Sequence, residues 1–244
     1  MAEKLQVIYE PKGAAREYAA LAVNLALTCP HGCRYCYAPG TLRKTAAEFH
    51  VATWPRDGVL DKLRRDADTL KARGCTDEIL LCFLCDPYAP GLERTTTSAL
   101  HILAAAGLNA TVLTKGGMRA QHDFPILREA GFRFGTSLSW ATDRDRAAWE
   151  PFAASVQSRI DALTRAHNVG IKTWVSMEPV IDPEQACALV PLLADVVDEW
   201  KIGKWNHSAE AAAIDWSAFR RAIVQELKAV NATYYLKRDL VEAT

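Results

Sequence analysis

The amino-acid sequence predicts an α/β fold, a partial (β/α)6 barrel of the TIM type with parallel strands inside and helices outside. Short strand-like segments alternate with helix-like segments six times along the chain, and each crossover between parallel strands needs such a helix. The segment at 78–85 is apolar almost throughout, which is typical of a parallel strand covered on both faces. A doubly wound open sheet shows the same alternation and is the alternative fold.

The first strand is expected at 21–27, directly before a cysteine-rich stretch, and residues 41–56 are expected to be irregular. The next five strands are expected at 78–85, 110–114, 134–139, 172–177 and 199–202. The six helices are expected at 57–73, 95–106, 125–130, 156–167, 184–196 and 216–230, with a short additional strand at 233–236. Apolar residues at helical spacing identify the first helix, and a glycine, which readily ends a helix, follows several of them.

Length and composition fit one domain. The chain has 244 residues, of which 50% are hydrophobic, so a core of barrel size is available. We expect a single domain over 1–244, with a lead-in at 1–20, a barrel core at 21–207, and a C-terminal helix and tail at 208–244.

The charge balance excludes a strongly basic nucleic-acid-binding protein. Lys and Arg number 29, Asp and Glu also number 29, and any contact with nucleic acid would therefore need a local patch. No apolar run is long enough to cross a membrane, and the N-terminus has no apolar signal core. An odd number of cysteines, 7 in all, without a secretory signal predicts a reducing compartment, so we expect a cytoplasmic protein.

Three cysteines, Cys29, Cys33 and Cys36, stand at CxxxCxxC spacing just after the first expected strand. Three thiolates from one loop can hold three irons of a four-iron–sulfur cluster, and such clusters usually have four cysteine ligands. Since no fourth cysteine is near in the sequence, one iron would stay open to a group that is not protein. A zinc site with His31 as the fourth ligand is the alternative, but one short loop with His31 between two of the cysteines can hardly close a tetrahedron.

With the aromatic Tyr35 before its last cysteine, this stretch resembles the CxxxCxΦC motif of the radical S-adenosylmethionine (SAM) superfamily, in which Φ is aromatic. The resemblance implies the barrel fold, a 4Fe–4S cluster held by Cys29, Cys33 and Cys36, and SAM bound at the open iron. It also implies that Tyr35 lies against the adenine of SAM.

Shorter stretches resemble the spore photoproduct lyase group, also called DNA-repair-photolyase-like, and this likeness runs from Tyr9 to about His207. The stretches are Cys85-Asp86-Pro87-Tyr88-Ala89-Pro90, Thr114-Lys115 and Ser137-Leu138-Ser139. Glu150-Pro151 and Arg159 also resemble that group, although we expect Arg159 to be a surface or capping residue.

Polar or reactive residues follow each expected strand, at the end of the barrel where enzymes of this fold have their sites. SAM carries an amino group, a carboxylate and ribose hydroxyls, for which Asp86, Lys115 and Ser137 are the candidate partners. The full predicted cofactor-binding set is Tyr35, Asp86, Lys115, Ser137, Ser139 and Glu178. Lys201 and Lys204 are expected at the same mouth.

Cys85 and Cys82 are candidate hydrogen donors to a product radical, because the lyase group keeps a cysteine near the end of the second strand. Aligned on Asp86, that position falls at Phe83, with Cys82 and Cys85 beside it. Strand alternation puts Cys85 on the face of Phe83 and nearest the mouth, so Cys85 is the preferred donor. A buried inert thiol is the alternative for both. Tyr88 is a further candidate, as a relay of hydrogen atoms, although we expect an aromatic packing role for it.

The predicted function is that of a radical SAM enzyme, in which the reduced cluster cleaves SAM and a 5′-deoxyadenosyl radical abstracts hydrogen from a substrate. Electrons would come from a flavodoxin- or ferredoxin-type donor. The family likeness points to a nucleic-acid base or nucleotide as substrate, while a small molecule or a peptide stays open. The alternatives without catalysis are an iron–sulfur electron carrier and a zinc-stabilised nucleic-acid-binding module.

Overall fold

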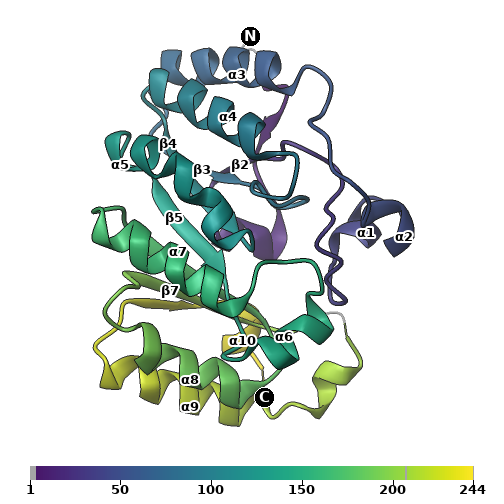
Figure 1. Cartoon of the computed structure of the whole chain (residues 1–244), viewed down its shortest axis with the longest axis vertical. Helices are drawn as coiled ribbons and strands as arrows, with labels where there is room; N and C mark the ends of the chain where they lie inside the picture. Colours follow the sequence, from purple (N-terminus) through teal and green to yellow (C-terminus); the bar gives the residue numbers. More distant parts are fainter. Residues whose placement is uncertain (1–3, 207, 244) are drawn as a thin grey trace.

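The computed structural model describes residues 4–206 and 208–243, and in this part of the chain eight strands form a single sheet. The strands stand in sequence order across the sheet, from β1 at one edge to β8 at the other (Figure 1). They are β1 (Ile8–Tyr9), β2 (Leu21–Val23), β3 (Glu78–Leu81), β4 (Asn109–Thr114), β5 (Arg133–Ser137), β6 (Thr173–Val180), β7 (Glu199–Lys204) and β8 (Tyr234–Leu236). β1 pairs antiparallel with β2, and every later pair is parallel.

A helix follows each strand from β2 to β7 and packs on the outer face of the sheet (Figure 1). These helices are α3 (Val59–Ala72), α4 (Glu93–Ala105), α5 (Phe124–Glu129), α7 (Val156–Asn168), α8 (Pro183–Leu193) and α9 (Trp216–Ala229). The predicted partial (β/α)6 barrel is confirmed. The doubly wound alternative is wrong, because its strand order would reverse within the sheet. None of the helices in the described ranges is both long and apolar enough to cross a membrane.

Several short elements were not predicted from the sequence. They are β1, α1 (Ala38–Thr41), α2 (Ala46–Phe49), α6 (Asp143–Trp149) and α10 (Arg238–Val241). The prediction of irregular structure at 41–56 missed α2, which begins with a capping box. The Thr45 hydroxyl accepts from the Glu48 N–H (3.3 Å), and the Glu48 carboxylate accepts from the Thr45 N–H (2.8 Å). The additional strand expected near the C-terminus is present as β8.

β2 and β3 end several residues earlier than predicted. The side chain of Asn24, the residue after β2, provides the physical reason. Its Oδ1 accepts hydrogen bonds from the backbone N–H groups of Phe83 and Leu84, both at 2.8 Å. A side chain therefore replaces strand pairing at this point and draws the chain after β3 toward the end of β2.

The barrel interior is filled at the amino ends of the strands. Ala22, Leu80 and Trp174 come from β2, β3 and β6, and their meeting in one buried cluster places them across the inside of the barrel. The indole Nε1 of Trp174 donates to Thr111 Oγ1 (2.9 Å). Gly135 on β5 makes room for this ring, because a Cβ there would lie 2.2 Å from Trp174 Cε2. The carboxyl ends of the strands are left as the open mouth.

A buried ion pair ties α7 to the cysteine-rich loop. Arg159 on α7 is fully buried and donates to the Glu150 carboxylate, to the Ser137 carbonyl (2.9 Å) and to the Ala154 carbonyl (3.0 Å). The Glu150 carboxylate also accepts from the hydroxyl of Tyr35. Burial is the strongest single effect on Glu150 and acts to raise its pKa, but the charges of Arg159 and Lys115, with the hydrogen bonds from Arg159 and Tyr35, together outweigh burial and hold that pKa below its ordinary value. The expectation that Arg159 is a surface or capping residue was wrong.

Replacing Gly135 by Ala should destabilise the protein, because the new methyl group overlaps the Trp174 ring. We expect a loss of about 1–3 kcal/mol in the free energy of unfolding, measured by urea denaturation. Gly40→Ala is the matched control, since a Cβ at Gly40 meets nothing within 4 Å. The control should change stability by less than about 1 kcal/mol, and a Gly135→Ala protein as stable as the control would contradict this packing.

Replacing Glu150 by Gln should cost about 3–5 kcal/mol of stability at neutral pH, because it leaves the Arg159 charge buried without its partner. The control is Asp61→Asn, which breaks the exposed pair with Arg64 (3.3 Å) and should cost less than about 1 kcal/mol. Equal effects of the two substitutions in urea denaturation would argue against the buried pair as a stabilising contact.

The same pair predicts a pH dependence. Since the folded-state pKa of Glu150 lies below its ordinary value, its contribution is complete above the unfolded-state pKa, about 4.3, and is lost as the pH falls through the folded-state pKa. The stability gap between wild type and Glu150→Gln should therefore shrink below about pH 4. A difference in unfolding free energy that increases as the pH falls would contradict this prediction.

Candidate active site

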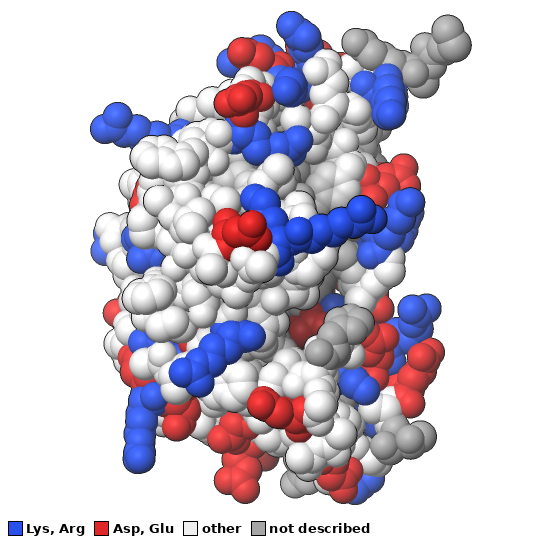
Figure 2. All heavy atoms as spheres, turned by 90° about the vertical axis from the view of Figure 1, so that its right-hand side faces the viewer, with Lys and Arg blue, Asp and Glu red and all other residues white. Residues whose placement is uncertain are grey.

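The cysteine-rich loop follows β2 at the mouth of the barrel and is clamped by backbone hydrogen bonds on two sides. The Cys29 N–H donates to the Phe49 carbonyl in α2 (3.2 Å). The Arg34 N–H donates to the Trp149 carbonyl in α6 (2.9 Å), so the loop is held between α2 and α6. Figure 2 looks onto this side of the molecule and shows a hollow in its surface with acidic atoms inside it.

The three thiols lie in one buried neighbourhood. Cys29 and Cys33 are buried and Cys36 is half-buried. Burial raises the pKa of all three, and for Cys33 to about 12, although the Lys115 ammonium acts in the opposite direction. The free thiols are therefore protonated at neutral pH, and a metal that binds them would displace their protons.

The donor set fits a cluster better than a single zinc ion. In residues 4–206 and 208–243, no three His, Cys, Asp or Glu side chains lie close enough to hold one metal ion. His31, the fourth ligand of the zinc alternative, is buried, with its Nδ1 3.6 Å from Asp86 and its Nε2 3.2 Å from the Arg119 guanidinium. Burial lowers the pKa of His31 to about 4. In an iron–sulfur cluster each cysteine binds a different iron, so three thiols that do not converge on one point suit it.

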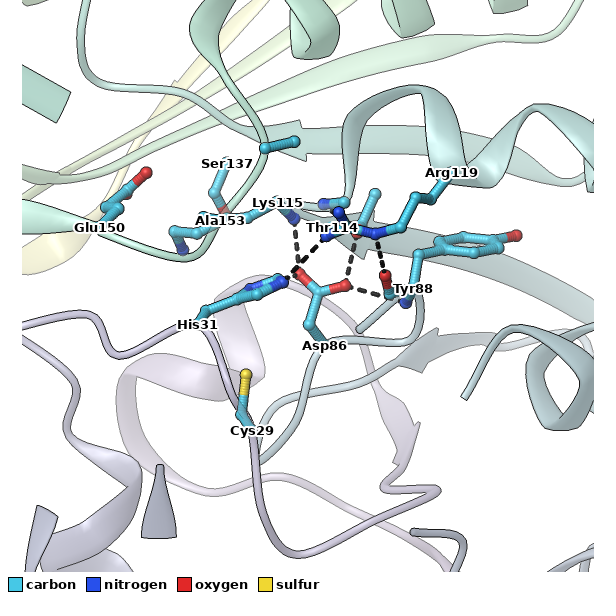
Figure 3. A network of polar contacts seen from close by, with 12 residues as sticks. Cys29, His31, Asp86, Tyr88, Thr114, Lys115, Arg119, Ser137, Glu150 and Ala153 are labelled. Carbon is cyan, nitrogen blue, oxygen red and sulfur yellow. Dashed lines mark hydrogen bonds and ion pairs between the residues drawn. The ribbon is translucent and has the colours of Figure 1, made fainter. Parts of the chain in front are cut away.

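Asp86 joins the loop after β3 to the end of β4, as Figure 3 shows. Its carboxylate accepts from the N–H of Tyr88 (2.9 Å), the hydroxyl of Thr114 (2.6 Å) and the N–H of Lys115 (2.6 Å). These bonds hold Lys115 above the cysteine loop. Contact of Asp86 with the amino group of SAM stays a prediction, and its carboxylate already has this structural role.

The structure brings several other predicted residues to the same place. Lys115 is half-buried, and its Nζ lies 5.7 Å from the centroid of the Tyr35 ring. Ser137 ends β5 and Ser139 follows two residues later, both buried. Figure 3 shows Lys115 and Ser137 on the opposite side of His31 from Cys29. A cation, an aromatic ring and the Ser137 hydroxyl thus lie beside the cysteine loop.

Glu178 reaches the mouth from the other half of the barrel. β6 is longer than predicted and includes Glu178, whose carboxylate accepts from the Tyr18 hydroxyl (2.5 Å) and from Lys237 Nζ (2.6 Å). The same hydroxyl lies 2.7 Å from Ser176 Oγ. Burial raises the pKa of Tyr18, and the Glu178 charge raises it further.

Tyr18 and Lys237 were not predicted as site residues. Parallel pairing of β8 with β7 sets Leu236 beside Ile202, so Lys237 follows at the carboxyl end of the sheet. A firmer assignment of β8 would have found it, but nothing in the sequence points to Tyr18. Lys201 is buried and donates to the Tyr18 carbonyl (2.9 Å), so it holds the N-terminal segment.

The predicted catalytic residues pack in the core. Cys82 and Cys85 belong to the large core that includes buried residues of α3 and α4, whereas Phe83 packs with the cluster inside the barrel. The alternation argument that placed Cys85 beside Phe83 was wrong, because β3 ends at Leu81. Tyr88 is also buried in that core, and its hydroxyl donates to Asp123 (2.9 Å). These three side chains thus pack in the core outside the barrel interior, although Cys85 is near enough to Cys29 for its charge to raise the pKa of that thiol.

Comparison with known proteins gives matches in sequence and in fold. The family model of the radical SAM superfamily matches residues 23–189. The uncharacterized protein ORF301 of Acidianus two-tailed virus is 26% identical over 172 residues, 67% of this chain and 57% of that protein. The uncharacterized protein MJ0683 of Methanocaldococcus jannaschii is 24% identical over 166 residues, 67% of this chain and 61% of that protein. The chain thus spans less than two thirds of the length of these two relatives.

Two solved structures share the fold at low identity. Spore photoproduct lyase complexed with dinucleoside spore photoproduct has a TM-score of 0.70 and 16% identity, covering 95% of this chain and 78% of that one. Streptococcus suis SuiB bound to S-adenosylmethionine has a TM-score of 0.68 and 13% identity, covering 88% of this chain and 49% of that one. Because the family model covers well over half of the sequence, the chain belongs to the radical SAM superfamily.

Proposed function

We propose that the chain is an enzyme that cleaves SAM with a 4Fe–4S cluster held by Cys29, Cys33 and Cys36, and that it abstracts hydrogen from a substrate. One observation carries the proposal: the CxxxCxxC loop lies at the mouth of a partial barrel, and His31, the nearest further ligand type, is engaged by Asp86 and Arg119. One corner of the cluster would then be free for SAM.

The chain's own residues would bind and orient SAM. When bound, the cluster supplies the electron that splits SAM into methionine and a 5′-deoxyadenosyl radical. Lys115 would pair with the SAM carboxylate, and Tyr35 would lie against the adenine with its hydroxyl fixed by Glu150. Ser137 and Ser139 would bind the ribose hydroxyls.

Glu178 and Asp86 complete the proposed binding set from opposite sides of the mouth. The position of each carboxylate is fixed by the hydrogen bonds described above. Hydrogen return from Cys85 or Cys82, and relay through Tyr88, stay predictions, since these side chains pack outside the barrel interior.

A nucleic-acid base or nucleotide is the proposed substrate. Support comes from the fold shared with a lyase that was solved with a dinucleoside. A peptide is the second candidate, because SuiB of the same fold was solved with the precursor peptide SuiA. Direct comparison of oligonucleotides, nucleosides and peptides for SAM-dependent mass shifts would decide between these classes.

Replacing Cys29, Cys33 or Cys36 by Ala should abolish the cluster and the formation of 5′-deoxyadenosine. The measurement is iron and sulfide content after anaerobic reconstitution, followed by product analysis with dithionite as reductant. Cys75→Ala and Cys187→Ala are the matched controls, because these thiols lie outside the loop, and both should keep four irons. Wild-type protein that binds one zinc instead would favour the structural module, and a cluster without SAM cleavage would favour the electron carrier.

Replacing Lys115 by Met should weaken SAM binding by roughly ten- to a hundredfold, because a charge-assisted contact with the carboxylate is lost. The dissociation constant is measured by titration of the reconstituted protein. Lys172→Met removes an exposed lysine at the amino end of β6 and should leave SAM binding unchanged. An unaltered dissociation constant in the Lys115 variant would remove this residue from the proposed site.

A further inference from the structure

The segment that carries the cysteines has an unusual charge. Residues 27–56 contain four basic residues and a single acidic one, in a chain whose formal charges cancel. The basic residues are Arg34, Arg43, Lys44 and Arg56. The acidic residue is Glu48, whose carboxylate is used within the capping box of α2. We call the part from α1 to the end of this segment, residues 38–56, the cover segment.

The cations of this region are free to meet a partner. Arg34, Arg43 and Lys44 are exposed, and none forms a salt bridge with another residue of the described chain. Figure 2 looks onto the side where α1 and α2 lie and shows Lys and Arg side chains across the middle of the face, with an acidic side chain beside them. This local excess of positive charge is the kind of surface that attracts an acidic protein.

Exposed apolar side chains accompany these charges. Within the cover segment Trp54 is 73% exposed and Val51 is 44% exposed. Large apolar side chains that are exposed together with a rim of charge are typical of protein contact sites.

The cover segment lies directly against the cysteines. Cys29 and Cys36 pack with Ala38, Leu42 and Phe49 in a small apolar cluster of their own. One layer of side chains therefore separates the thiols from the outer surface of α1 and α2. Electron transfer slows steeply with distance, so this outer surface gives a short entry for an electron, while the mouth on the other side of the loop would be left to SAM and substrate.

We propose that the cover segment, with Arg34, Arg43 and Lys44, is the docking surface for a small acidic electron-donor protein of the flavodoxin type. This inference rests on the proposed function, because it assumes a cluster in the cysteine loop. The donor's reduced flavin loses one electron and the cluster gains it, with no bond made or broken in the transfer. Charge complementarity would steer and orient the donor.

A basic surface with exposed aromatic rings is also typical of single-stranded nucleic-acid binding. The location favours the electron donor, since Arg43 and Lys44 lie on the outside of the cysteine loop. A substrate has to reach the mouth on the inner side, near Lys115 and Ser137. The test must therefore distinguish binding of an oligonucleotide from binding of the electron-donor protein.

The test compares a charge-reversed pair, Arg43→Glu with Lys44→Glu, to a matched control, Arg65→Glu with Lys172→Glu. The control residues are exposed on α3 and before β6, and both variants change the net charge equally. A purified bacterial flavodoxin is titrated into each reconstituted protein at low salt, and 5′-deoxyadenosine is measured with reduced flavodoxin and, separately, with dithionite. A labelled single-stranded oligonucleotide is titrated in parallel.

We expect the cover-segment variant to bind flavodoxin at least about tenfold more weakly than wild type, and salt to weaken wild-type binding. Its flavodoxin-driven product formation should fall, while its dithionite-driven activity and both properties of the control stay unchanged. The proposed docking surface would be overturned if the variant bound flavodoxin as tightly as the wild-type chain does. It would also be overturned if the variant lost only its binding of the oligonucleotide. If the wild type forms no 5′-deoxyadenosine with dithionite, the proposed function is overturned. The flavodoxin titration would still show whether the cover segment is the docking surface.

Discussion

The position of the cysteine loop depends on the buried pair of Glu150 and Arg159. A buried carboxylate or guanidinium destabilises the fold strongly when its charge has no partner. The pairing of Glu150 with Arg159 therefore holds the start of α7 against the end of β5. The guanidinium reaches the Ser137 carbonyl, and the carboxylate accepts from Tyr35 in the loop. One buried contact therefore sets the distance between the loop and the strand end proposed to bind the ribose of SAM.

The same neighbourhood is electrostatically suited to hold negative charge. Three thiolates would bring negative charge into a buried site, and burial alone acts against them, as the raised thiol pKa values show. Lys115 and Arg159 both act to lower the pKa of Cys33. The cations that orient Tyr35 and SAM in the proposal thus also offset the charge of the ligands, which links cluster binding to the geometry of the cofactor site.

Features encoded over short stretches could be predicted from the sequence. The cysteine spacing lies within eight residues, and the alternation of strands and helices predicts a parallel sheet, while the resemblance of the cysteine motif favours the barrel order of its strands. The partners of Glu178 could not be predicted, because Tyr18 and Lys237 reach it from opposite ends of the chain. The side-chain directions of Cys82 and Cys85 could not be predicted for a related reason. Asn24, which is distant in sequence, accepts hydrogen bonds from the Phe83 and Leu84 N–H groups and ends the strand there.

The filled floor of the barrel limits how a substrate could reach SAM in the proposed reaction. Trp174 and Leu80 close the interior at the amino ends of the strands, so entry is from the carboxyl end, the end that also holds the cysteine loop. Inside, the substrate would meet the partly exposed rings and aliphatic side chains of Phe83 and Leu113, and a carboxylate whose charge Lys237 already balances. Under the proposed function, a flat, largely uncharged group, such as a base carried on a longer chain, would suit this lining better than a free phosphate, since burying an unpaired charge is costly. Any charged part of such a substrate would stay outside the mouth.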